Sequence, residues 1–552
     1  MSEAPQAVTA SIPGPLRPAV EQSVALLLQQ QIPDRLREGD PTIWGPPGTP
    51  EVADRLGWLT IAERMLGLRN EYAEFAAEVA ADGIEDVVLL GMGGSSLAPE
   101  VLRRTFQSRP DRPRLHVLDS TDAGAIGAVQ DAIDPARTLF LVSSKSGGTI
   151  EPNSLFAHFH AIVADGANFA AVTDPGTSLQ ELARRDGFRG VFAGDPDIGG
   201  RYSALSPFGL VPATLTGIDT TPLLDGAPAA WDTATETGDW DEPDAAAAGA
   251  ACWLGAALGA LAAGGRDKLT FVIAQTLPGL GLWLEQLVAE STGKQGRGIL
   301  PVAEEPPAEP SEYGEDRVFA HLTDASNPEP AVQDRMEALA LDGHPVLTIP
   351  TCGPNDLGRV FLLAELAVAV AGWRLEINPF DQPNVQQAKD ATNTVLEGYA
   401  ASGELPEVDD ASREEVRSLL LGAAPPEYVA LMAYLRPTPE FDIAAAGLRE
   451  VVRRAGRATT TFGYGPRFLH STGQFHKGGP PVGRFLQILH DEDREMDIPG
   501  APYSFTTLKN AQATGDLQTL RSLGRPALRV RLTGDDPAGA LRSLTATIRE
   551  GT

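Results

Sequence analysis

The sequence contains very little cysteine. Only Cys252 and Cys352 occur in 552 residues, far apart and in no CxxC pair. A disulfide framework needs several paired cysteines, and a structural zinc site needs clustered Cys or His ligands. The sequence therefore predicts neither feature, and it fits a reducing compartment such as the cytoplasm.

Positive charge is also scarce. Lys and Arg number 44 against 74 Asp and Glu, which gives a formal net charge of −30 and a pI near 4.6. Nucleic acids and anionic membranes would be repelled by such a surface, so we expect neither as a partner. If the protein binds an anion, it must concentrate positive charge locally.

Signals for targeting, membrane insertion and metal binding are weak. The start of the chain, with Glu3 and Pro5, lacks the basic stretch and apolar run of a signal peptide. Residues 245–265 are uncharged but mostly Ala and Gly, which favours a buried core helix over a membrane span. His158 and His160 are two apart on a predicted helix and point in different directions, so we expect no metal and no cofactor.

The chain is too long for one hydrophobic core. Strands and helices alternate from about residue 85, which is typical of parallel sheets covered by helices on both faces. The predicted strands are 86–90, 115–119, 138–142, 169–173, 269–274, 344–349, 374–377, 428–435, 458–463, 485–489 and 527–532. The predicted helices are 20–31, 61–82, 97 onward, 280–288, 357–372, 443–454 and 507–523.

We predict an α/β fold in four segments. Residues 1–84 form a helical N-terminal segment with a packing role. Residues 85–225 form a first α/β domain and residues 226–400 a second. Residues 401–552 form a C-terminal α/β segment that completes the second domain and carries a histidine motif.

The first predicted strand ends in a glycine-rich loop, GMGGSS at residues 91–96. Glycines at this place let a ligand approach the backbone closely. A GxG after a first strand, with Asp119 at the end of the second, also raises the alternative of a dinucleotide site. Ser96, however, stands where the third glycine of that fingerprint belongs. The alternative would also leave the loop at 143–149 without a role.

The segment LFLVSSKSGGTIEP, residues 139–152, runs from a buried strand into small, hydroxylated and basic residues. Its Ser/Gly run lets successive backbone N–H groups face one point, and Pro152 fits the first turn of a helix whose positive end favours an anion. The segment predicts a phosphate-binding turn, with an ordinary strand-to-helix turn as the alternative. The side chains that could contact the anion are Ser144, Lys145, Ser146 and Thr149.

Further polar residues lie at the ends of predicted elements. Arg201 follows two glycines in a loop between the two halves of the predicted cleft. Glu290 lies at a helix end with Lys294 four residues on, a spacing that is also typical of exposed ion pairs. Gln382 and Lys389 are seven apart, so one helix would place both on the same side.

Taken together, these stretches resemble the glucose-6-phosphate isomerase family, which is built on two sugar-isomerase α/β domains. The matching motifs are GMGGSS at 91–96, SKSGGTIEP at 144–152, GGRYS at 199–203, ESTGK at 290–294, NPFDQPNVQQAK at 378–389 and HSTGQ at 470–474. The resemblance assigns sugar contacts to Gly94 and Ser95, phosphate contacts to Ser144, Lys145, Ser146 and Thr149, a charge beside the reacting carbons to Arg201, the base to Glu290, a site contact to Gln382, and ring opening to Lys389 and His470.

The sequence departs from the family pattern in three ways. Gly148 stands where relatives often carry Thr, and Asn384 replaces an expected glycine. The histidine motif also follows Lys389, whereas in relatives it lies between the glutamate and the lysine, so a block has moved to the C-terminus. In relatives the neighbouring subunit supplies this histidine, which implies a homodimer. Relocation could instead let His470 act within its own chain.

The implied reaction is the interconversion of glucose 6-phosphate and fructose 6-phosphate, in which the ring opens and a proton moves between adjacent carbons through a cis-enediolate. A desolvated Glu290 would serve as the base, and the permanent charge of Arg201 would stabilise the oxyanion. Two alternatives stay open: an enzyme that also accepts mannose 6-phosphate, and a regulator that binds a phosphosugar without reacting.

Overall fold

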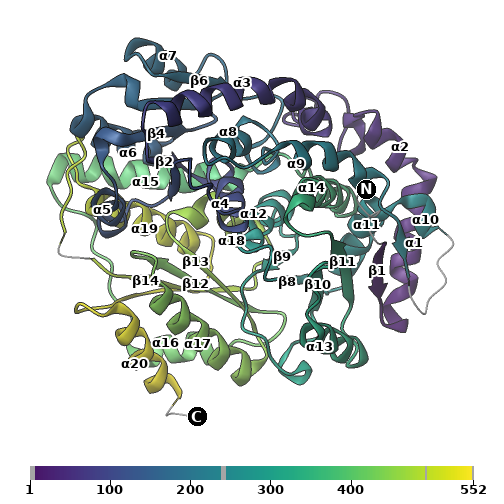
Figure 1. The fold of residues 1–552 in the computed structure, drawn as a ribbon. Coiled ribbons are helices and arrows are strands. Elements are labelled where there is room, and N and C mark those ends of the chain that lie inside the picture. The colour runs from purple at the N-terminus through teal and green to yellow at the C-terminus, as the bar shows by residue number, and fades with distance from the viewer. Residues whose placement is uncertain (1–6, 238–243, 492–493, 550–552) are drawn as a thin grey trace.

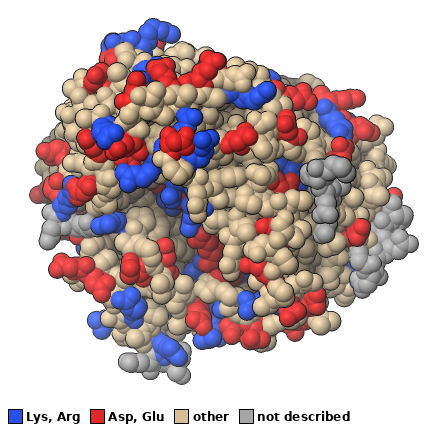
Figure 2. Space-filling view, viewed as in Figure 1, with Lys and Arg blue, Asp and Glu red and all other residues tan. Residues whose placement is uncertain are grey.

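A computed structural model describes residues 7–237, 244–491 and 494–549, in which the strands form three sheets surrounded by helices (Figure 1). Figure 2 shows acidic side chains spread among basic ones over one face, with a hollow near its middle. Glu3 and Pro5, on which the expectation of no signal peptide depended, lie outside the described residues. None of the helices in these ranges has the length and apolar character that a membrane span requires.

The first sheet is parallel throughout, with the order β3-β2-β4-β5-β6. Its strands are β2 (Asp86–Gly91), β3 (Arg114–Leu118), β4 (Thr138–Ser143), β5 (Phe169–Thr173) and β6 (Gly190–Ala193). Alternate residues of β2 face different cores. Val87 and Leu89 join the core that contains α3 (Ile61–Ala81), whereas Val88 and Leu90 pack with α6 (Ile150–Val163). Both faces are therefore covered, as the apolar runs predict.

The second sheet has the order β7-β1-β11-β10-β8-β9. Its strands are β1 (Val8–Ser11), β7 (Thr235–Glu236), β8 (Lys268–Ile273), β9 (Leu300–Val302), β10 (Arg317–Asp324) and β11 (Val346–Thr351). β1 pairs antiparallel with β11, so the N-terminal segment is not helical throughout and does more than cover the fold. A four-residue strand is too short to show a period, and its pairing with β11 is set by tertiary context.

The C-terminal strands form a third sheet of their own, parallel throughout and ordered β13-β12-β14-β15. Its strands are β12 (Tyr428–Tyr434), β13 (Thr459–Tyr464), β14 (Gly483–Leu489) and β15 (Ala527–Arg531). They do not extend the second sheet, although we expected this segment to complete the second domain. The division of the chain into domains stays a prediction.

Helix α19 (Phe505–Ser522) lies between the first and third sheets. Phe505 and Leu508 belong to the core of α6 and the first sheet. Leu517 and Leu520 pack on the third sheet together with Phe475 of α18 (Gly473–Gly478). This helix therefore holds the C-terminal sheet against the first sheet.

Two predicted elements need correction. The strand at 374–377 is absent, because α14 (Leu357–Arg374) continues through Arg374 and Glu376 then adopts a left-handed φ of 58°, which no strand accommodates. The core helix at 245–265 is present and buried, but Gly249 divides it at φ 69° into α10 (Ala245–Ala248) and α11 (Ala250–Ala263).

The other helices cover the sheets and carry the site. They are α1 (Arg17–Gln29), α2 (Ile32–Arg37), α4 (Leu97–Thr105), α5 (Ala123–Ala132), α7 (Ser178–Arg185), α8 (Pro207–Leu215), α9 (Thr221–Gly226), α12 (Leu280–Thr292), α13 (Pro330–Leu341), α15 (Pro383–Ser402), α16 (Arg413–Leu421), α17 (Pro439–Gly456) and α20 (Pro537–Arg549).

Candidate functional site

Two glycines after β2 let three chain segments meet. A Cβ on Gly94 would lie 2.0 Å from the carbonyl oxygen of Gly200, and a Cβ on Gly93 would lie 2.8 Å from the carbonyl oxygen of His470. Any side chain at these positions would force the segments apart. The loop that also contains the buried Ser95 thus joins the Arg201 loop to the His470 segment.

Arg201 is buried, with 1% of its side chain exposed, and it links several elements. Its Nε donates to Ser291 Oγ (2.8 Å), and its Nη1 donates to Glu290 Oε2 (3.3 Å) and Gln382 Oε1 (2.7 Å). Its Nη2 donates to two backbone carbonyls in the 379–381 loop, at 2.5 and 3.1 Å. One guanidinium therefore brings together the predicted base and the predicted glutamine contact.

Glu290 lies near the end of α12 and is 5% exposed. Besides the contact with Arg201, its Oε1 accepts a hydrogen bond from Gln286 Nε2 at 3.4 Å. Burial raises the pKa of Glu290, while the neighbouring charge of Arg201 opposes that rise. A buried carboxylate with a raised pKa is a stronger base than one in water, which is what proton abstraction from carbon requires.

Lys294 does not pair with Glu290. Its Nζ donates to the carbonyl oxygen of Asn378 and to Asp381 Oδ1, both at 2.6 Å. Burial lowers the pKa of Lys294 to about 7. The alternative that Glu290 is a solvated carboxylate with Lys294 as its partner is therefore wrong, and Lys294 instead fixes the loop that precedes Gln382.

The 144–149 turn connects β4 to the N-terminus of α6. Ser144 Oγ donates to Thr149 Oγ1 (3.1 Å), and the Gly148 N–H donates to Ser146 Oγ (3.4 Å). α6 begins directly after the turn, at Ile150, so the unpaired N–H groups of its first turn lie at the same end. A Cβ at Gly148 would meet no atom within 4 Å, which leaves open space beside these hydroxyls.

Lys145 already has an acidic partner. Its Nζ forms an ion pair with Asp174, just beyond β5, and donates to the carbonyl oxygen of Asp195 at 2.9 Å. Burial raises the pKa of Asp174, and the contact with Lys145 counteracts that rise. An anion at this turn must therefore compete with Asp174 for Lys145, or be held by the hydroxyls and the helix N-terminus.

His470 meets a buried carboxylate of its own chain. Its Nε2 lies 2.9 Å from Glu151 Oε1, which also accepts a hydrogen bond from Gln512 Nε2 at 2.7 Å. The Gln512 Oε1 accepts from Thr121 Oγ1 at 2.7 Å, which fixes the orientation of the amide. Burial alone would raise the pKa of Glu151, but His470 and Lys389 hold it below its ordinary value.

A small cavity joins the turn to the histidine. It has a volume of about 90 Å³ and is lined by residues from the 144–149 turn, α6, α15, the His470 segment and α19. Lys389 reaches this cavity, whereas Gln382 precedes α15 and contacts Arg201. Gln286 Nε2 donates to the His470 carbonyl at 2.9 Å as well as to Glu290, and so connects the two halves of the site.

Several polar residues that support the site were not assigned from the sequence. Glu151 belongs to the SKSGGTIEP motif, so the motif itself could have indicated it. Gln474 holds two segments together, since its Nε2 donates to Asn384 Oδ1 and to the Gly293 carbonyl, both at 2.9 Å. Asn384, a departure from the family pattern, is thus paired with the HSTGQ motif. Gln512 carries no local signal that could have revealed its role.

The geometry does not favour a dinucleotide site at the 91–96 loop. Asp119 Oδ2 and Oδ1 accept hydrogen bonds from Arg467 at 2.6 and 2.7 Å, and Ser96 Oγ also donates to Asp119 at 3.3 Å. The carboxylate expected to bind a ribose in that alternative is therefore buried and already paired.

Comparison with known proteins gives a consistent result. The family model described as phosphoglucose isomerase matches residues 70–302. The chain is 30% identical to the glucose-6-phosphate isomerase of Rubrobacter xylanophilus over 373 residues, which cover 58% of this chain and 84% of that protein.

Solved structures resemble the fold as well. A hypothetical protein, TT0462, from Thermus thermophilus has a TM-score of 0.56 and 26% identity, and the match covers 70% of this chain and 99% of that one. A glucose-6-phosphate isomerase from Chlamydia trachomatis has a TM-score of 0.54 and 18% identity, covering 70% and 87% of the two chains. At 18% identity, the similarity to the second structure shows a similar fold and nothing more.

Proposed function

The chain belongs to the glucose-6-phosphate isomerase family, and we propose that it interconverts glucose 6-phosphate and fructose 6-phosphate at the site around Arg201, Glu290 and His470. The resemblance seen in the six sequence motifs is confirmed. The enzyme names of the matching family model and relative also favour catalysis over a sensor that only binds. We assign the first two sheets to sugar-isomerase-type domains.

The assignment of this site depends on one set of hydrogen bonds. Arg201 binds both Glu290 and Gln382, and Gln286 bridges Glu290 to the backbone of His470. Purified, chelator-treated protein should therefore convert glucose 6-phosphate to fructose 6-phosphate, with fructose 6-phosphate detected directly. Absence of turnover from a folded preparation would overturn the proposal.

Phosphate binding comes first in the proposed mechanism. The hydroxyls of Ser144, Ser146 and Thr149, together with the N-terminus of α6, would hold the phosphate, and Lys145 would turn from Asp174 toward the bound anion. Anchoring the sugar at this distant end orients its reacting carbons, so binding energy can appear as rate. Gly94 and Ser95 would contact the sugar from the loop after β2.

Ring opening follows and needs proton transfer at the ring oxygen and at O1. His470 is suited to this, because an imidazole side chain can both donate and accept a proton. Glu151 accepts from His470 Nε2 and fixes the ring orientation, and Lys389 lines the same cavity. All of these residues belong to one chain, so we assign ring opening to the chain's own histidine.

Isomerisation then requires a base between C1 and C2. Glu290 would remove the proton from one carbon and return it to the other, so a single carboxylate serves both directions. Arg201 beside it carries a permanent charge that stabilises the enediolate oxygens. The burial of both side chains strengthens this interaction, because water is largely excluded.

His470→Ala is expected to slow the reaction of the cyclic sugar by about 10²- to 10⁴-fold, the usual contribution of general acid–base catalysis. The variant should convert an analogue of glucose 6-phosphate that cannot close its ring nearly as fast as the unmodified enzyme does, because no ring has to open. Steady-state rates with both substrates provide the measurement.

His116 offers a matched control, since its Nε2 lies 2.8 Å from Asp86 Oδ1 in a similar pair outside the site. His116→Ala should leave the ratio of the two rates unchanged. Equal losses for cyclic and open-chain substrates in His470→Ala would contradict a role in ring opening.

Gln512→Met is expected to move the acid limb of kcat/KM for the cyclic sugar to higher pH by about one unit. Its amide donates to Glu151 Oε1, and this hydrogen bond favours the ionised carboxylate. Without the donor, the pKa of Glu151 rises, so Glu151 protonates and releases His470 at a higher pH. A hydrogen bond to a charged group is worth about 1.5–3 kcal/mol, and 1.36 kcal/mol corresponds to one pKa unit.

Gln487→Met is the control, because Gln487 is also a buried glutamine with a donated and an accepted hydrogen bond, but it lies on β14 outside the site. Its pH profile should match that of the unmodified protein. If kcat/KM of Gln512→Met falls by the same factor at every pH, with no shift along the pH axis, Gln512 has only a structural role.

A further inference from the structure

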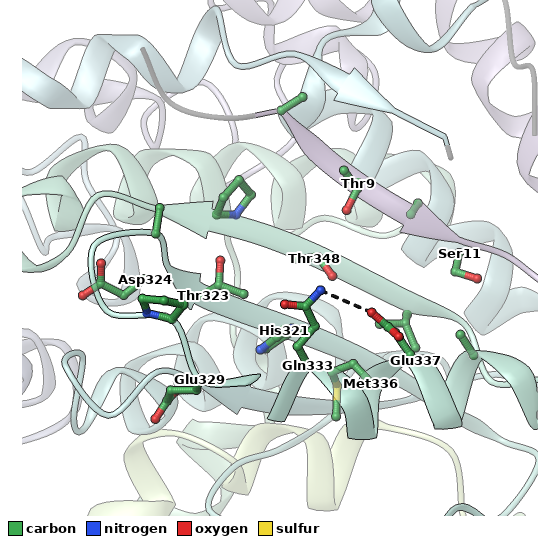
Figure 3. A pocket seen from close by; sticks show the side chains of 17 residues that line it. Thr9, Ser11, His321, Thr323, Asp324, Glu329, Gln333, Met336, Glu337 and Thr348 are labelled. Carbon is green, nitrogen blue, oxygen red and sulfur yellow. Dashed lines mark hydrogen bonds between the residues drawn. The ribbon is translucent and has the colours of Figure 1, made fainter. Parts of the chain in front are cut away.

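A cavity of about 640 Å³ lies on the second sheet and shares no residue with the site described above. Its floor consists of β1, β10 and β11, and α13 forms its side (Figure 3). Cavities of roughly 300–1,000 Å³ are typical of small-molecule sites. None of the catalytic steps proposed above uses it.

The floor carries a polar row across three strands. Thr9 of β1 stands opposite Thr348 of β11, and Thr348 stands opposite His321 of β10. Figure 3 shows the three side chains on the same side of the sheet. The neighbouring residues Leu347 and Leu322 alternate to the other face, where they pack with α11 and α14. Thr9 is exposed, Thr348 is half-buried and His321 is buried, so the row becomes more enclosed toward His321.

His321 is the buried member of this row. It is 6% exposed, and in the described part of the chain its imidazole makes no hydrogen bond. Burial lowers its pKa to about 4, so the ring is neutral at pH 7 and offers one donor and one acceptor. Neither ring nitrogen is fully enclosed by the described residues, so each is accessible from the cavity. A ligand there could form the hydrogen bonds that the fold around His321 does not provide.

The charges around the cavity indicate which ligand fits. No Lys or Arg is among the residues that line it, whereas Glu329 and Glu337 lie along its rim. Glu337 Oε1 already accepts from Gln333 Nε2 at 3.2 Å. The third carboxylate, Asp324, accepts from Thr276 Oγ1 and from the Ser326 N–H, both at 2.8 Å. A phosphate or carboxylate ligand would therefore meet repulsion and no counter-charge.

The row of Thr9, Thr348 and His321 is neutral, and each of these side chains can both donate and accept hydrogen bonds. This pattern complements hydroxyl groups, which do the same. A cation would need carboxylates at the floor, but here they lie at the rim or are already bonded. We propose that this cavity binds an uncharged, hydroxyl-rich small molecule, an unphosphorylated sugar or polyol, through His321, Thr348 and Thr9.

The test observes the imidazole directly. The chain has eight histidines, so imidazole NMR signals of the full-length protein are few, and His321→Gln identifies the signal of His321 by its loss. D-glucose, D-sorbitol, spermidine and inorganic phosphate are titrated separately. Glucose or sorbitol should shift the His321 signal saturably, and phosphate should not. The signal of His344, a buried histidine that does not line the cavity, should stay in place.

Thr348→Val removes one hydroxyl of the row with little change in volume, and it should weaken the saturable shift at least tenfold. An unchanged His344 signal in this variant shows that the fold is intact. Three outcomes would overturn the proposal: no saturable shift with either polyol, a larger shift with spermidine or phosphate, and an undiminished shift in Thr348→Val. A shift of the His470 signal alone would assign glucose to the catalytic site instead.

Discussion

Glu290→Gln should lower kcat by about 10²- to 10⁴-fold while the affinity for the sugar phosphate changes little. Glutamine keeps the shape of the side chain and can still accept a hydrogen bond from Arg201 through its Oε1, so the binding surface remains. It cannot take a proton from carbon, and the carboxylate is the only base placed beside Arg201 in our account. Turnover and sugar-phosphate binding, measured on the same preparation, separate the two effects.

Glu285 provides the matched control on the same helix. It is buried, its carboxylate accepts from the Ala303 N–H at 3.1 Å, and burial raises its pKa to about 8. Glu285→Gln therefore removes a similar buried carboxyl away from the site, and kcat should stay within a few-fold of the unmodified value. Retained turnover in Glu290→Gln, or an equal loss in Glu285→Gln, would remove Glu290 from its role as the base.

Arg201→Lys should lower kcat by about 10²- to 10³-fold, the usual effect of losing one oxyanion donor. Lysine keeps the positive charge, but it cannot reach Ser291, Gln382 and the 379–381 carbonyls together from one rigid, planar group. The variant should also lose thermal stability, since buried acceptors are left without donors.

Arg359→Lys separates catalysis from stability. Arg359 is also 1% exposed and binds Asp356 and the Pro350 carbonyl outside the site. Both lysine variants should unfold at lower temperature, but only Arg201→Lys should lose turnover beyond what its folded fraction explains. If both variants lost kcat in proportion to their unfolded fraction, the charge of Arg201 would have no direct part in catalysis.

The sequence predicted best where a local pattern decides the structure. β2, β4 and β5 follow from short apolar runs that end in glycine or small residues, because a strand buried on both faces needs just such a run. The glycines at 93 and 94 were expected to allow close approach of a ligand. In the structure their lack of a Cβ also admits the Gly200 and His470 backbones.

Long-range pairing could not be predicted in the same way. β1 has only four residues, too few for an alternation of apolar and polar residues to predict a strand. It becomes a strand because it pairs with the edge of β11. The Lys145–Asp174 pair joins residues from two different strand ends, so the turn motif alone gave no sign that Lys145 is already occupied. The bridge from Thr121 through Gln512 to Glu151 likewise depends on α19 lying against the first sheet.

The altered order of motifs shows the same limit. The sequence indicated that the histidine block had moved behind Lys389, but not where it would fold. The third sheet and α19 carry His470 to Glu151 of its own chain, and Gln474 fixes the segment against Asn384. The contacts around the histidine thus form within one chain, although its motif follows Lys389 in the sequence.

The most direct measurement is a crystal structure of the protein with a five-carbon aldonate 5-phosphate, an open-chain compound whose carboxylate resembles the enediolate. We expect its phosphate within hydrogen-bond distance of Ser144, Ser146 or Thr149, and its carboxylate between Glu290 and Arg201, about 3 Å from each. His470 of the same chain should lie beside the ligand. A ligand bound elsewhere, or one whose carboxylate lies far from Glu290, would contradict the account.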